Sequence, residues 1–460
     1  MTYIQMINYN LPNGPSFFTT IFEGREKLEM SEKWFKKEFE KFGDTFSVPL
    51  NLTEKAIITQ DKGFIRYLLE ENSQNYAKSN HTVKHFGKYI GKNLLTSNGH
   101  FWLQQRRLLQ PAFHLNNLKG IYTNLQQSID NYLDDFPTGR SIDIYPFMHH
   151  MTFHLLTKIL FNSPVTEKTL KEMDSNFDKV LKFMVKDIRQ PYTVWWRKLR
   201  GQSGACQLRV KKIRAVLQEI INQRRSEKTS YNDLLDIMIE APFDEKKQPM
   251  NDEQIIDELM IFFFAGHTTT ANALSWTIYL LAKHPKFLFH LKSLTENINL
   301  EECIHHPYLL AVLKESLRLY PPIRGVDRAA LEDDSYQEFS YPKGTMIIIF
   351  LYGLHRNPKF WKQPNTFNPN RFLKENNKQF PLKAFFPFGG GPRSCIGYNF
   401  AMAEMTIFLK TFIHRFGINT TAQIPKMVPQ VTIRPDKIVL DINIRQTFDF
   451  YNKTTIPHVA

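Results

Sequence analysis

The sequence predicts a mainly α-helical protein with small antiparallel β-sheets. Apolar residues recur at helical spacing through most of the 460-residue chain, whereas segments with the alternation of a β-strand are few and short. The chain contains no internal repeat and no low-complexity tract, and no linker rich in glycine, serine or proline marks a domain boundary. We therefore expect residues 1–460 to form a single domain.

Helical periodicity dominates the chain from residue 31 onward. Asn251 is a favourable N-cap for the longest helical segment and is followed by Gln254 three residues later, while Tyr320-Pro-Pro322 ends another helix. The segments expected to be helical are 31–42, 61–72, 100–113, 116–135, 146–162, 167–187, 204–228, 231–240, 252–284, 286–295, 308–319 and 396–415.

Strand-like segments are confined to a few places. Segments 46–50 and 56–58 indicate a hairpin, and 345–350 is a β-branched run. Segments 431–433 and 438–444 flank Arg434-Pro-Asp-Lys437, which is a turn signal. The segment 241–248, with Pro242 and mixed charge, predicts a loop between helices.

Cysteine usage indicates a reducing compartment. The chain has three cysteines, Cys206, Cys303 and Cys395, and such a sparse, odd set argues against a disulfide framework. The first ten residues lack a basic start followed by an apolar core, so we expect neither a signal peptide nor a membrane anchor. The apolar stretch from Met260 to Ala282 is interrupted by glycine, threonine and asparagine, which favours a buried core helix over a membrane span. We expect a cytoplasmic location.

The chain is basic, with a formal net charge of +14 at pH 7. Part of the excess lies between Arg197 and Lys228. Such a surface can attract an acidic redox protein, nucleic acid or anionic lipid, and it can equally be the solvated face of an amphipathic helix. Because no pattern of interleaved aromatic residues or zinc ligands accompanies the basic residues, we expect no nucleic-acid binding.

The most informative segment surrounds Cys395. It reads Phe388-Gly-Gly-Gly-Pro-Arg-Ser-Cys-Ile-Gly397 and precedes an apolar helical segment. Glycines allow positive φ and close approach of the backbone to a flat ligand. Backbone N–H groups of the turn and the N-terminus of the following helix stabilise a thiolate, which is a good axial ligand for haem iron. Phe388 can cover the sulfur, and Arg393 can pair with a haem propionate.

The pattern Phe388-x-x-Gly391-x-Arg393-x-Cys395-x-Gly397 resembles the cysteine-loop signature of the cytochrome P-450 superfamily of haem-thiolate monooxygenases. Further motifs of the family occur in the right order, so that the resemblance covers roughly residues 90 to 440. It implies the cytochrome P-450 fold and haem b with Cys395 as the axial iron ligand. It also implies that Arg393, Phe388 and Gly397 bind the cofactor. The missing N-terminal anchor is similar to the soluble bacterial members rather than the membrane-tethered ones.

The segment Ala265-Gly-His-Thr-Thr-Thr270, at the centre of the longest expected helix, resembles the family's oxygen-binding motif. A glycine and three β-branched threonines in a buried helix predict a local disturbance of the hydrogen-bond ladder that makes room for a ligand. The resemblance implies that Thr269 is the alcohol that takes part in oxygen activation. It further implies that Ala265 and Gly266 border the haem face.

One position of this motif departs from the family. Where the family has an aspartate or glutamate, this chain has Thr268, so the usual acid–alcohol pair for proton delivery is incomplete. Protons could come from His267, from a water chain or from the substrate. The departure leaves open a peroxide-driven or a non-oxidative reaction.

Three charged residues are implied to lock the cysteine loop from behind. Lys314-Glu-Ser-Leu-Arg-Leu-Tyr-Pro-Pro322 resembles the family's Glu-x-x-Arg element, and Phe367-Asn-Pro-Asn-Arg-Phe372 resembles its Pro-x-Arg-Phe element. The resemblance implies a buried network of Glu315, Arg318 and Arg371. Burial of such a network is favourable only if every charge is paired.

Further residues are implied to hold the haem propionates. Trp102-x-x-x-Arg106 resembles the family's propionate-clamping helix, in which Trp102 and Arg106 would donate to a propionate. Arg328, after Pro321-Pro322, occupies another position that the resemblance assigns to propionate contact.

The substrate pocket is expected at three apolar segments, which are the variable loop around Val83 to Ile90, the helix around Phe262, and the segment after Pro322. Their apolar character suggests a hydrophobic substrate such as a fatty acid, terpenoid, steroid or polyketide. The residues expected to line the pocket are Phe86, Phe262, Ile323 and Val326.

Three histidines stand apart from these motifs. His149, His150 and His154 include a pair at helical spacing that could bind zinc. Because no acidic or cysteine partner accompanies them in the sequence, we interpret them as core or surface histidines.

The resemblance implies reductive activation of O2 at iron and insertion of one oxygen atom into a small hydrophobic substrate. Because only a short segment follows Cys395, we expect electrons to come from NAD(P)H through a separate ferredoxin or flavodoxin, to a monomeric enzyme with no integral membrane segment. One alternative is a haem-thiolate peroxygenase or isomerase-type enzyme that does not need reductive O2 activation. A second alternative is a non-enzymatic haem sensor, which would need no Thr269.

Overall fold

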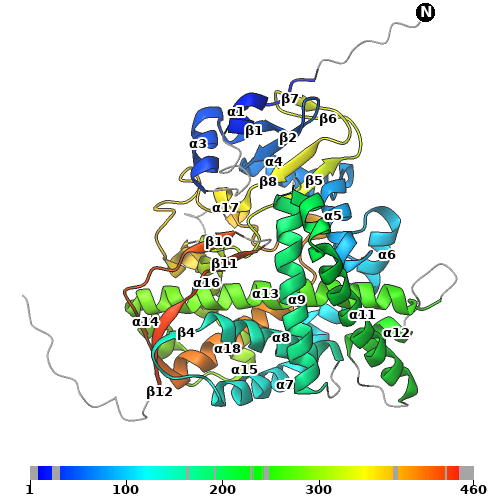
Figure 1. The fold of residues 1–460 in the computed structure, drawn as a ribbon. Helices are drawn as coiled ribbons and strands as arrows, with labels where there is room; N and C mark the ends of the chain where they lie inside the picture. The colour runs from blue at the N-terminus through cyan, green and yellow to red at the C-terminus, as the bar shows by residue number, and fades with distance from the viewer. Residues whose placement is uncertain are drawn as a thin grey trace, which may run out of the picture.

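The computed structural model combines a large helical part with a smaller part rich in β-strands (Figure 1). The small part lies at the top of Figure 1, and the helix α13 crosses the large part below it. The structure describes residues 9–22, 32–161, 165–190, 193–227, 231, 233–240, 242, 248–376, 382–429 and 432–444.

Helix α13 (Asp252–Lys283) is the central element of the helical part. The Asn251 side chain accepts a hydrogen bond from the Gln254 N–H, as the sequence predicts for an N-cap, and acidic residues fill the first turn. Most side chains of α13 are buried, because it packs against α8, α16 and α18. Helix α13 therefore forms a common packing surface for these neighbouring helices.

The remaining helices surround α13 or support the strands. The α-helices of the large part are α5 (Asn80–Ile90), α6 (Gly99–Leu109), α7 (Leu115–Asp134), α8 (Tyr145–Phe161), α9 (Glu167–Arg189), α10 (Val194–Leu199), α11 (Gln202–Ser226), α12 (Leu234–Glu240), α14 (Pro285–Leu294), α15 (Leu300–His305), α16 (Pro307–Leu319) and α18 (Tyr398–Arg415). The small part contains α1 (Phe17–Phe22), α3 (Glu32–Phe42), α4 (Lys62–Arg66) and α17 (Leu351–Leu354).

Short tight or wide helical turns complete the helical elements. The segment η1 (Tyr67–Glu71) is a π-helix that continues α4. The 3-10 turns are η2 (Ser73–Asn75), η3 (Gln110–Phe113), η5 (Pro369–Phe372), η6 (Lys374–Asn376), η7 (Leu382–Ala384) and η8 (Gly391–Arg393).

The largest sheet has five strands in the order β1-β2-β8-β5-β3. Three of its pairs are antiparallel, whereas β2 and β8 run parallel. Smaller antiparallel sheets pair β4-β12-β9, β10-β11 and β6-β7. The strands are β1 (Thr45–Pro49), β2 (Lys55–Thr59), β3 (Tyr76–Ala77), β4 (Gly139–Asp143), β5 (Val326–Ala330), β6 (Asp334–Tyr336), β7 (Phe339–Tyr341), β8 (Met346–Ile349), β9 (Phe416–Thr420), β10 (Met427–Pro429), β11 (Ile433–Pro435) and β12 (Val439–Ile444).

Two apolar clusters fill the helical part on either side of α13. One joins α7, α8, α13, α16 and α18, and the other joins α8, α9, α11, α12 and α13. Two smaller clusters cover the two faces of the five-stranded sheet. The mainly helical fold with small sheets that the sequence predicts is confirmed.

Several local predictions need correction. The variable loop expected around Val83 to Ile90 is helix α5, capped by Ser79, whose side chain accepts from the Thr82 N–H. The turn signal expected from Arg434 to Lys437 overlaps the end of β11, and the strands on either side of it belong to different sheets, because β11 pairs with β10 while β12 pairs with β4 and β9. Most of the expected loop at 241–248 lies outside the described residues.

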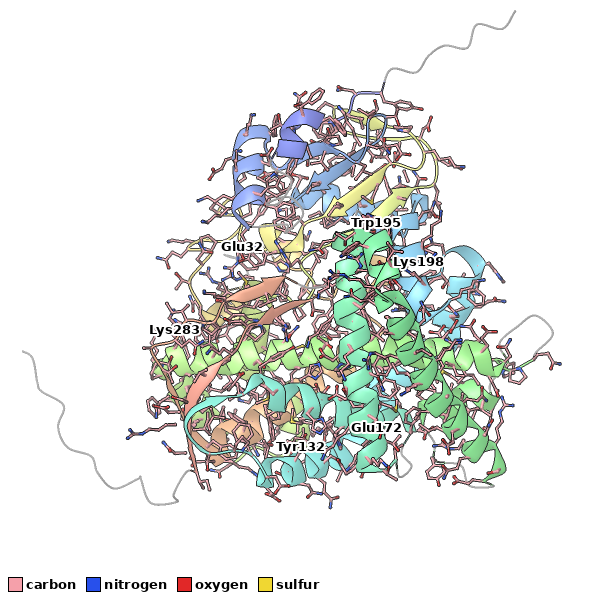
Figure 2. All side chains as sticks on the ribbon, in the orientation of Figure 1. Glu32, Tyr132, Glu172, Trp195, Lys198 and Lys283 are labelled. Atoms are coloured by element: carbon pink, nitrogen blue, oxygen red, sulfur yellow. The ribbon has the colours of Figure 1, made fainter. Side chains whose placement is uncertain are left out.

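No helix in the described ranges combines the length and the apolar character that a membrane span requires. The candidate stretch from Met260 to Ala282 lies within α13, and most of its side chains are buried among other helices. In contrast to the buried apolar side chains of α13, those of Trp195, Trp196 and Leu199 on α10 are exposed, beside Lys198. Figure 2 labels Trp195 and Lys198 on this short helix.

Candidate functional site

The glycine-rich loop before α18 holds Cys395 in a tightly defined turn. The Cys395 N–H donates to the Phe388 carbonyl at 2.9 Å, and the Ser394 N–H donates to the Gly391 carbonyl at 3.1 Å. Gly391 has a φ of +65°, and a Cβ atom there would overlap the Leu69 carbonyl of η1. The loop therefore packs directly onto the π-helix, and only glycine fits at this contact.

Cys395 differs from the other two cysteines in its access. It is the only exposed cysteine of the three, whereas Cys206 and Cys303 are buried. Burial raises the pKa values of Cys206 and Cys303 to about 11 and about 12, so both remain protonated thiols at neutral pH. Only Cys395 offers its sulfur to a ligand.

Cys395 is solvent-exposed and yet closely surrounded by protein atoms. Desolvation by nearby protein atoms raises the pKa of the Cys395 thiol even though the side chain is exposed. A hydrogen bond from the Gly397 N–H and the positive charge of Arg106 act in the opposite direction and favour the thiolate. Arg106 also donates to the Ser394 carbonyl at 2.8 Å.

Helix α13 exposes one short stretch in an otherwise buried sequence. Ala265 is exposed and Thr269 is half-buried, while Phe264 and Thr268 are buried. The Thr269 hydroxyl donates to the Ala265 carbonyl at 2.6 Å. The expected break of the helical ladder is wrong, because α13 is continuous and the threonine hydroxyls bond the carbonyls four residues earlier.

Gly266 and Thr268 face away from that exposed stretch. A Cβ atom on Gly266 would lie 2.8 Å from Leu156 Cδ2, so the glycine permits close packing of α13 on α8. The Thr268 hydroxyl lies 3.0 Å from His267 Nε2. Burial lowers the pKa of His267 to about 3, and the nearby His149 adds to the shift, so the imidazole is neutral at pH 7.

Glu315, Arg318 and Arg371 meet in a buried network behind the cysteine loop. Arg318 donates twice to the Glu315 carboxylate, at 2.7 and 2.8 Å, and Arg371 Nε lies 3.2 Å from Glu315 Oε1. The exposed fractions of these side chains are 0%, 0% and 2%, so two buried cations share the one carboxylate of Glu315 within the protein.

His355 connects this network to the cysteine loop. Its carbonyl accepts from Arg318 at 2.8 Å, and its Nε2 accepts from the Phe386 N–H at 2.9 Å, just before the glycine-rich turn. Burial lowers the pKa of His355 to about 3, with Arg318 and Arg356 adding to the shift. The sequence analysis missed this residue, because no motif marks it.

A group of cations converges beside the same loop. Arg393 stacks over the Trp102 ring at 4.0 Å, and Arg328 is buried. Burial lowers the pKa of Arg393 to about 10, with a further contribution from Arg328. Burial lowers the pKa of Lys78 well below its usual value, and the positive charges of Arg393 and Arg328 add to the shift. The sequence analysis missed Lys78, which follows β3 without any recognisable signal.

Negative charge around these cations is too small to neutralise them. Asp327 is engaged by the hydroxyls of Ser79 and Thr82. Burial raises the pKa of Glu258 to about 8, so this acid is protonated at neutral pH. The group of Lys78, Arg328 and Arg393 therefore suits an anionic ligand such as the carboxylates of a haem.

The sequence model of the family described as "Cytochrome P450" matches residues 11–442. The chain belongs to the cytochrome P450 family. The match begins well before residue 90, where the motif resemblance starts, and includes the five-stranded sheet. A cytochrome P450 is a haem-thiolate monooxygenase that uses O2, a substrate and a source of electrons.

Relatives and solved structures agree with this assignment. The chain is 30% identical over 407 residues to cytochrome P450 4A10 of Rattus norvegicus, covering 82% of this chain and 79% of that protein. It is 31% identical over 385 residues to cytochrome P450 4F11 of Homo sapiens, covering 76% of this chain and 72% of that protein. The crystal structure of the cytochrome P450DA heme domain superposes with a TM-score of 0.81 at 20% identity, covering 95% of this chain and 98% of the other.

The residues of this cytochrome P450 suit a haem. Cys395 supplies an accessible sulfur, and the basic side chains of Lys78, Arg328 and Arg393 outnumber the nearby carboxyl groups of Asp327 and Glu258. Arg106 lies against the cysteine loop through the Ser394 carbonyl rather than within that group of cations.

The expected pocket residues lie on different elements of the P450 fold. Phe86 of α5 contacts the Phe264 ring at 5.9 Å, and Phe262 contacts Phe113 at 5.6 Å. Ile323 and Val326 are half-buried around the start of β5. The structure thus brings Phe86 to α13 through Phe264, which the sequence analysis did not single out.

Proposed function

We propose that this cytochrome P450 is a cytoplasmic, monomeric monooxygenase that oxidises a small hydrophobic substrate. In this proposal residues 1–460 form one haem domain, and electrons pass from NAD(P)H through a separate ferredoxin or flavodoxin. The observation that carries the proposal is the single accessible cysteine, held in a glycine-rich turn.

The proposed roles follow from the geometry around the cysteine loop. Haem b, when bound, supplies reductive activation of O2. Cys395 is the proposed iron ligand, and its thiolate is favoured by the Gly397 N–H and by Arg106. Phe388, whose ring packs edge-on against Tyr398 at 4.8 Å, is proposed to shield the sulfur from water. Arg393, Arg328 and Trp102 are proposed to hold the propionates.

On the other side of the proposed haem position, Thr269 is the proposed oxygen-activating alcohol. Its hydroxyl rests on the Ala265 carbonyl and can turn to a ligand beside the exposed Ala265. Thr268 cannot supply a proton as a carboxylic acid does, and its hydroxyl is paired with the neutral His267. Water that reaches Thr269 is therefore the proposed proton source.

An exposed arginine next to the cysteine loop and the basic net charge of the chain favour an acidic electron carrier. Arg107 is exposed on α6, beside Arg106, which contacts the loop. The whole chain carries a net charge of +14. Electron transfer from a ferredoxin or flavodoxin is thus expected to slow as the salt concentration rises.

The absorption spectrum of the reduced protein with carbon monoxide tests the central claim. A strongly red-shifted Soret band in the wild type and its loss in Cys395→Ala support a Cys395–iron bond. Cys206→Ala and Cys303→Ala are the matched controls and are expected to keep the band. A band that survives in Cys395→Ala would refute the assignment.

A second candidate is a haem-thiolate enzyme driven by peroxide, favoured by the missing acid at Thr268. The two are distinguished by product formation with O2, NAD(P)H and a reconstituted ferredoxin or flavodoxin chain, compared with hydrogen peroxide alone. Turnover with peroxide only would replace the monooxygenase proposal. Unchanged ligand binding and no turnover in either assay, in both wild type and Thr269→Ala, would indicate a sensor.

A further inference from the structure

The side of α8 that faces α9 carries a row of histidines, His149, His150 and His154. The sequence shows no acidic partner close to them, but the fold supplies two from α9, Glu167 and Asp174. In Figure 2 the labels Tyr132 and Glu172 mark α7 and α9, two of the helices that contact α8, and α13 contacts it as well. The interpretation as ordinary core or surface histidines therefore needs to be reconsidered.

Two sets of three residues bring metal-binding atoms together within 4.8 Å of one another. The inner set is His149, Asp174 and His267, from α8, α9 and α13. The outer set is His150, His154 and Glu167. The two sets differ in burial, whereas each contains one buried ligand atom without a hydrogen bond, Asp174 Oδ1 in the inner set and His154 Nε2 in the outer set.

The inner set is the better enclosed. The side chains of His149 and Asp174 are 15% and 16% exposed, and His267 is 2% exposed. In the outer set the Glu167 side chain is 67% exposed. An exposed carboxylate such as that of Glu167 is solvated by water and loses more side-chain entropy when it is fixed in one position than a buried carboxylate does. The inner set is therefore the stronger candidate for binding a cation.

The inner set has an unpartnered ligand atom. Asp174 Oδ1 is buried and has no hydrogen-bond partner among the described residues, although His149 Nδ1 lies 3.5 Å away. A buried carboxylate oxygen without a partner is unfavourable unless a cation or donor occupies the space beside it. With bonds of about 2.1 Å, two ligands of a tetrahedral zinc ion are roughly 3.4 Å apart. The observed separation of the two atoms matches that value.

Neighbouring groups orient the ligands of the inner set. His267 Nδ1 contacts the Phe263 carbonyl, which places the proton on Nδ1 and leaves Nε2 as the acceptor of the Thr268 hydroxyl, a contact that a metal ion would replace. Asp174 Oδ2 lies 3.2 Å from His150 Nδ1, so His150 holds the carboxylate from behind. Supporting hydrogen bonds of this kind are typical of metal ligands.

Rigid helices carry all three ligands. The Thr152 hydroxyl of α8 donates to the His267 carbonyl of α13 at 3.0 Å. Gly266 allows the two helices to approach closely at the same level. Ligands on packed helices keep their geometry better than ligands on loops.

We propose that His149, Asp174 and His267 bind one divalent transition-metal ion of the zinc class, with water as the fourth ligand. The site lies on the side of α13 away from the exposed Ala265, and it does not depend on the proposed monooxygenase activity. Coordination through His267 Nε2 removes the partner of the Thr268 hydroxyl, so metal binding also releases Thr268.

The test uses the haem-loaded protein without a histidine tag. Titration calorimetry with Zn²⁺ is expected to show one ion bound per chain, and elemental analysis after dialysis is expected to give the same stoichiometry. Zinc-edge X-ray absorption is expected to show two imidazoles and oxygen ligands at about 2.0–2.2 Å. No saturable zinc binding would overturn the proposal.

Variants of both sets identify the ligands. His149→Gln and Asp174→Asn are expected to weaken zinc binding by about tenfold or more. His154→Gln and Glu167→Gln, from the outer set, are the matched controls and are expected to leave the affinity unchanged. His85→Gln is a third control, because His81 and His85 form another histidine pair on α5.

The pattern across the variants decides the assignment. Loss of binding in any control, together with normal binding in His149→Gln, would overturn the proposal. Circular dichroism and the haem spectrum check that each variant is folded. Because His149→Gln retains all contacts of Asp174 with His150, it tests the site even if Asp174→Asn does not fold.

Discussion

Replacement of Glu315 by glutamine tests the network behind the cysteine loop most directly. The carboxylate accepts two hydrogen bonds from Arg318, one from Arg371 and one from the Asn368 N–H at 2.9 Å. Glu315→Gln keeps the volume of the side chain but leaves two buried guanidinium groups without a counter-charge. Breaking a buried ion pair in this way destabilises a protein by about 3–5 kcal/mol.

A surface ion pair provides the matched control. Lys182 and Asp178 on α9 lie 2.6 Å apart at i,i+4 spacing, and their side chains are 47% and 33% exposed. Asp178→Asn makes the same chemical change as Glu315→Gln in water, where such a pair contributes about 0.3–0.5 kcal/mol. The two variants therefore isolate the effect of burial.

Urea unfolding of the haem-loaded protein measures both variants. The midpoint is followed by circular dichroism and by the thiolate-dependent Soret band, because a bound cofactor makes a single two-state analysis unsafe. For Glu315→Gln we expect a large fall of the midpoint, with the Soret band lost first. A midpoint shift no larger than that of Asp178→Asn would refute the claim that the network holds the loop.

Three further predictions follow from individual residues. Gly391→Ala is expected to lower the haem content sharply, because its Cβ would overlap the Leu69 carbonyl at a φ of +65°, whereas Gly204→Ala, in an open helical position, is expected to be neutral or stabilising by up to about 1 kcal/mol. Equal haem contents in the two purified variants would contradict this packing argument. The pKa of His355 falls from 6.5 to about 3 on folding, so its contribution to stability is complete above pH 6.5 and decreases as the pH falls toward 3, by about 1.4 kcal/mol per pH unit. The difference between the urea midpoints at pH 7 and pH 5 should therefore be smaller in His355→Gln than in the wild type. An equal difference in the two proteins would count against a neutral buried imidazole. Lys78→Met is expected to speed haem transfer to an acceptor apoprotein, because one of three cations beside the loop is lost, and Lys84→Met is the control. Identical transfer rates for the two lysine variants would exclude Lys78 from cofactor binding.

Local sequence patterns were sufficient for the parts of the fold that depend on local physics. The Asn251 cap, the apolar periodicity of α13 and the β1–β2 hairpin are visible in short windows of sequence, and the structure has them at the expected places. Helix α5 was missed because its polar residues, including Lys84 and His85, hide the apolar stripe that buries Tyr89 and Ile90. The parallel pairing of β2 with β8 joins segments far apart in the chain, which no local pattern reports.

The residues of the candidate site likewise fall into those marked by a local motif and those placed by contacts between distant segments. Cys395, Glu315 and Arg318 lie in compact motifs whose spacing is itself the signal. Lys78 and His355 act only through partners that the fold brings from elsewhere, so nothing near them in the sequence marks their place. The acidic partners of the α8 histidines were missed for the same reason, because Asp174 meets His149 across two packed helices.

The contact between Gly391 and the Leu69 carbonyl has a consequence for the order in which the protein is made. The two residues are separated by roughly 320 positions in the chain. At a synthesis rate of about 5–20 residues per second, the π-helix leaves the ribosome tens of seconds before the loop that must seat on it. The nascent chain thus contains the π-helix surface that the loop contacts, together with Lys78, before Cys395 and Arg393 have been added. Under the proposed roles of Cys395 and Arg393, haem capture therefore follows synthesis of nearly the whole chain.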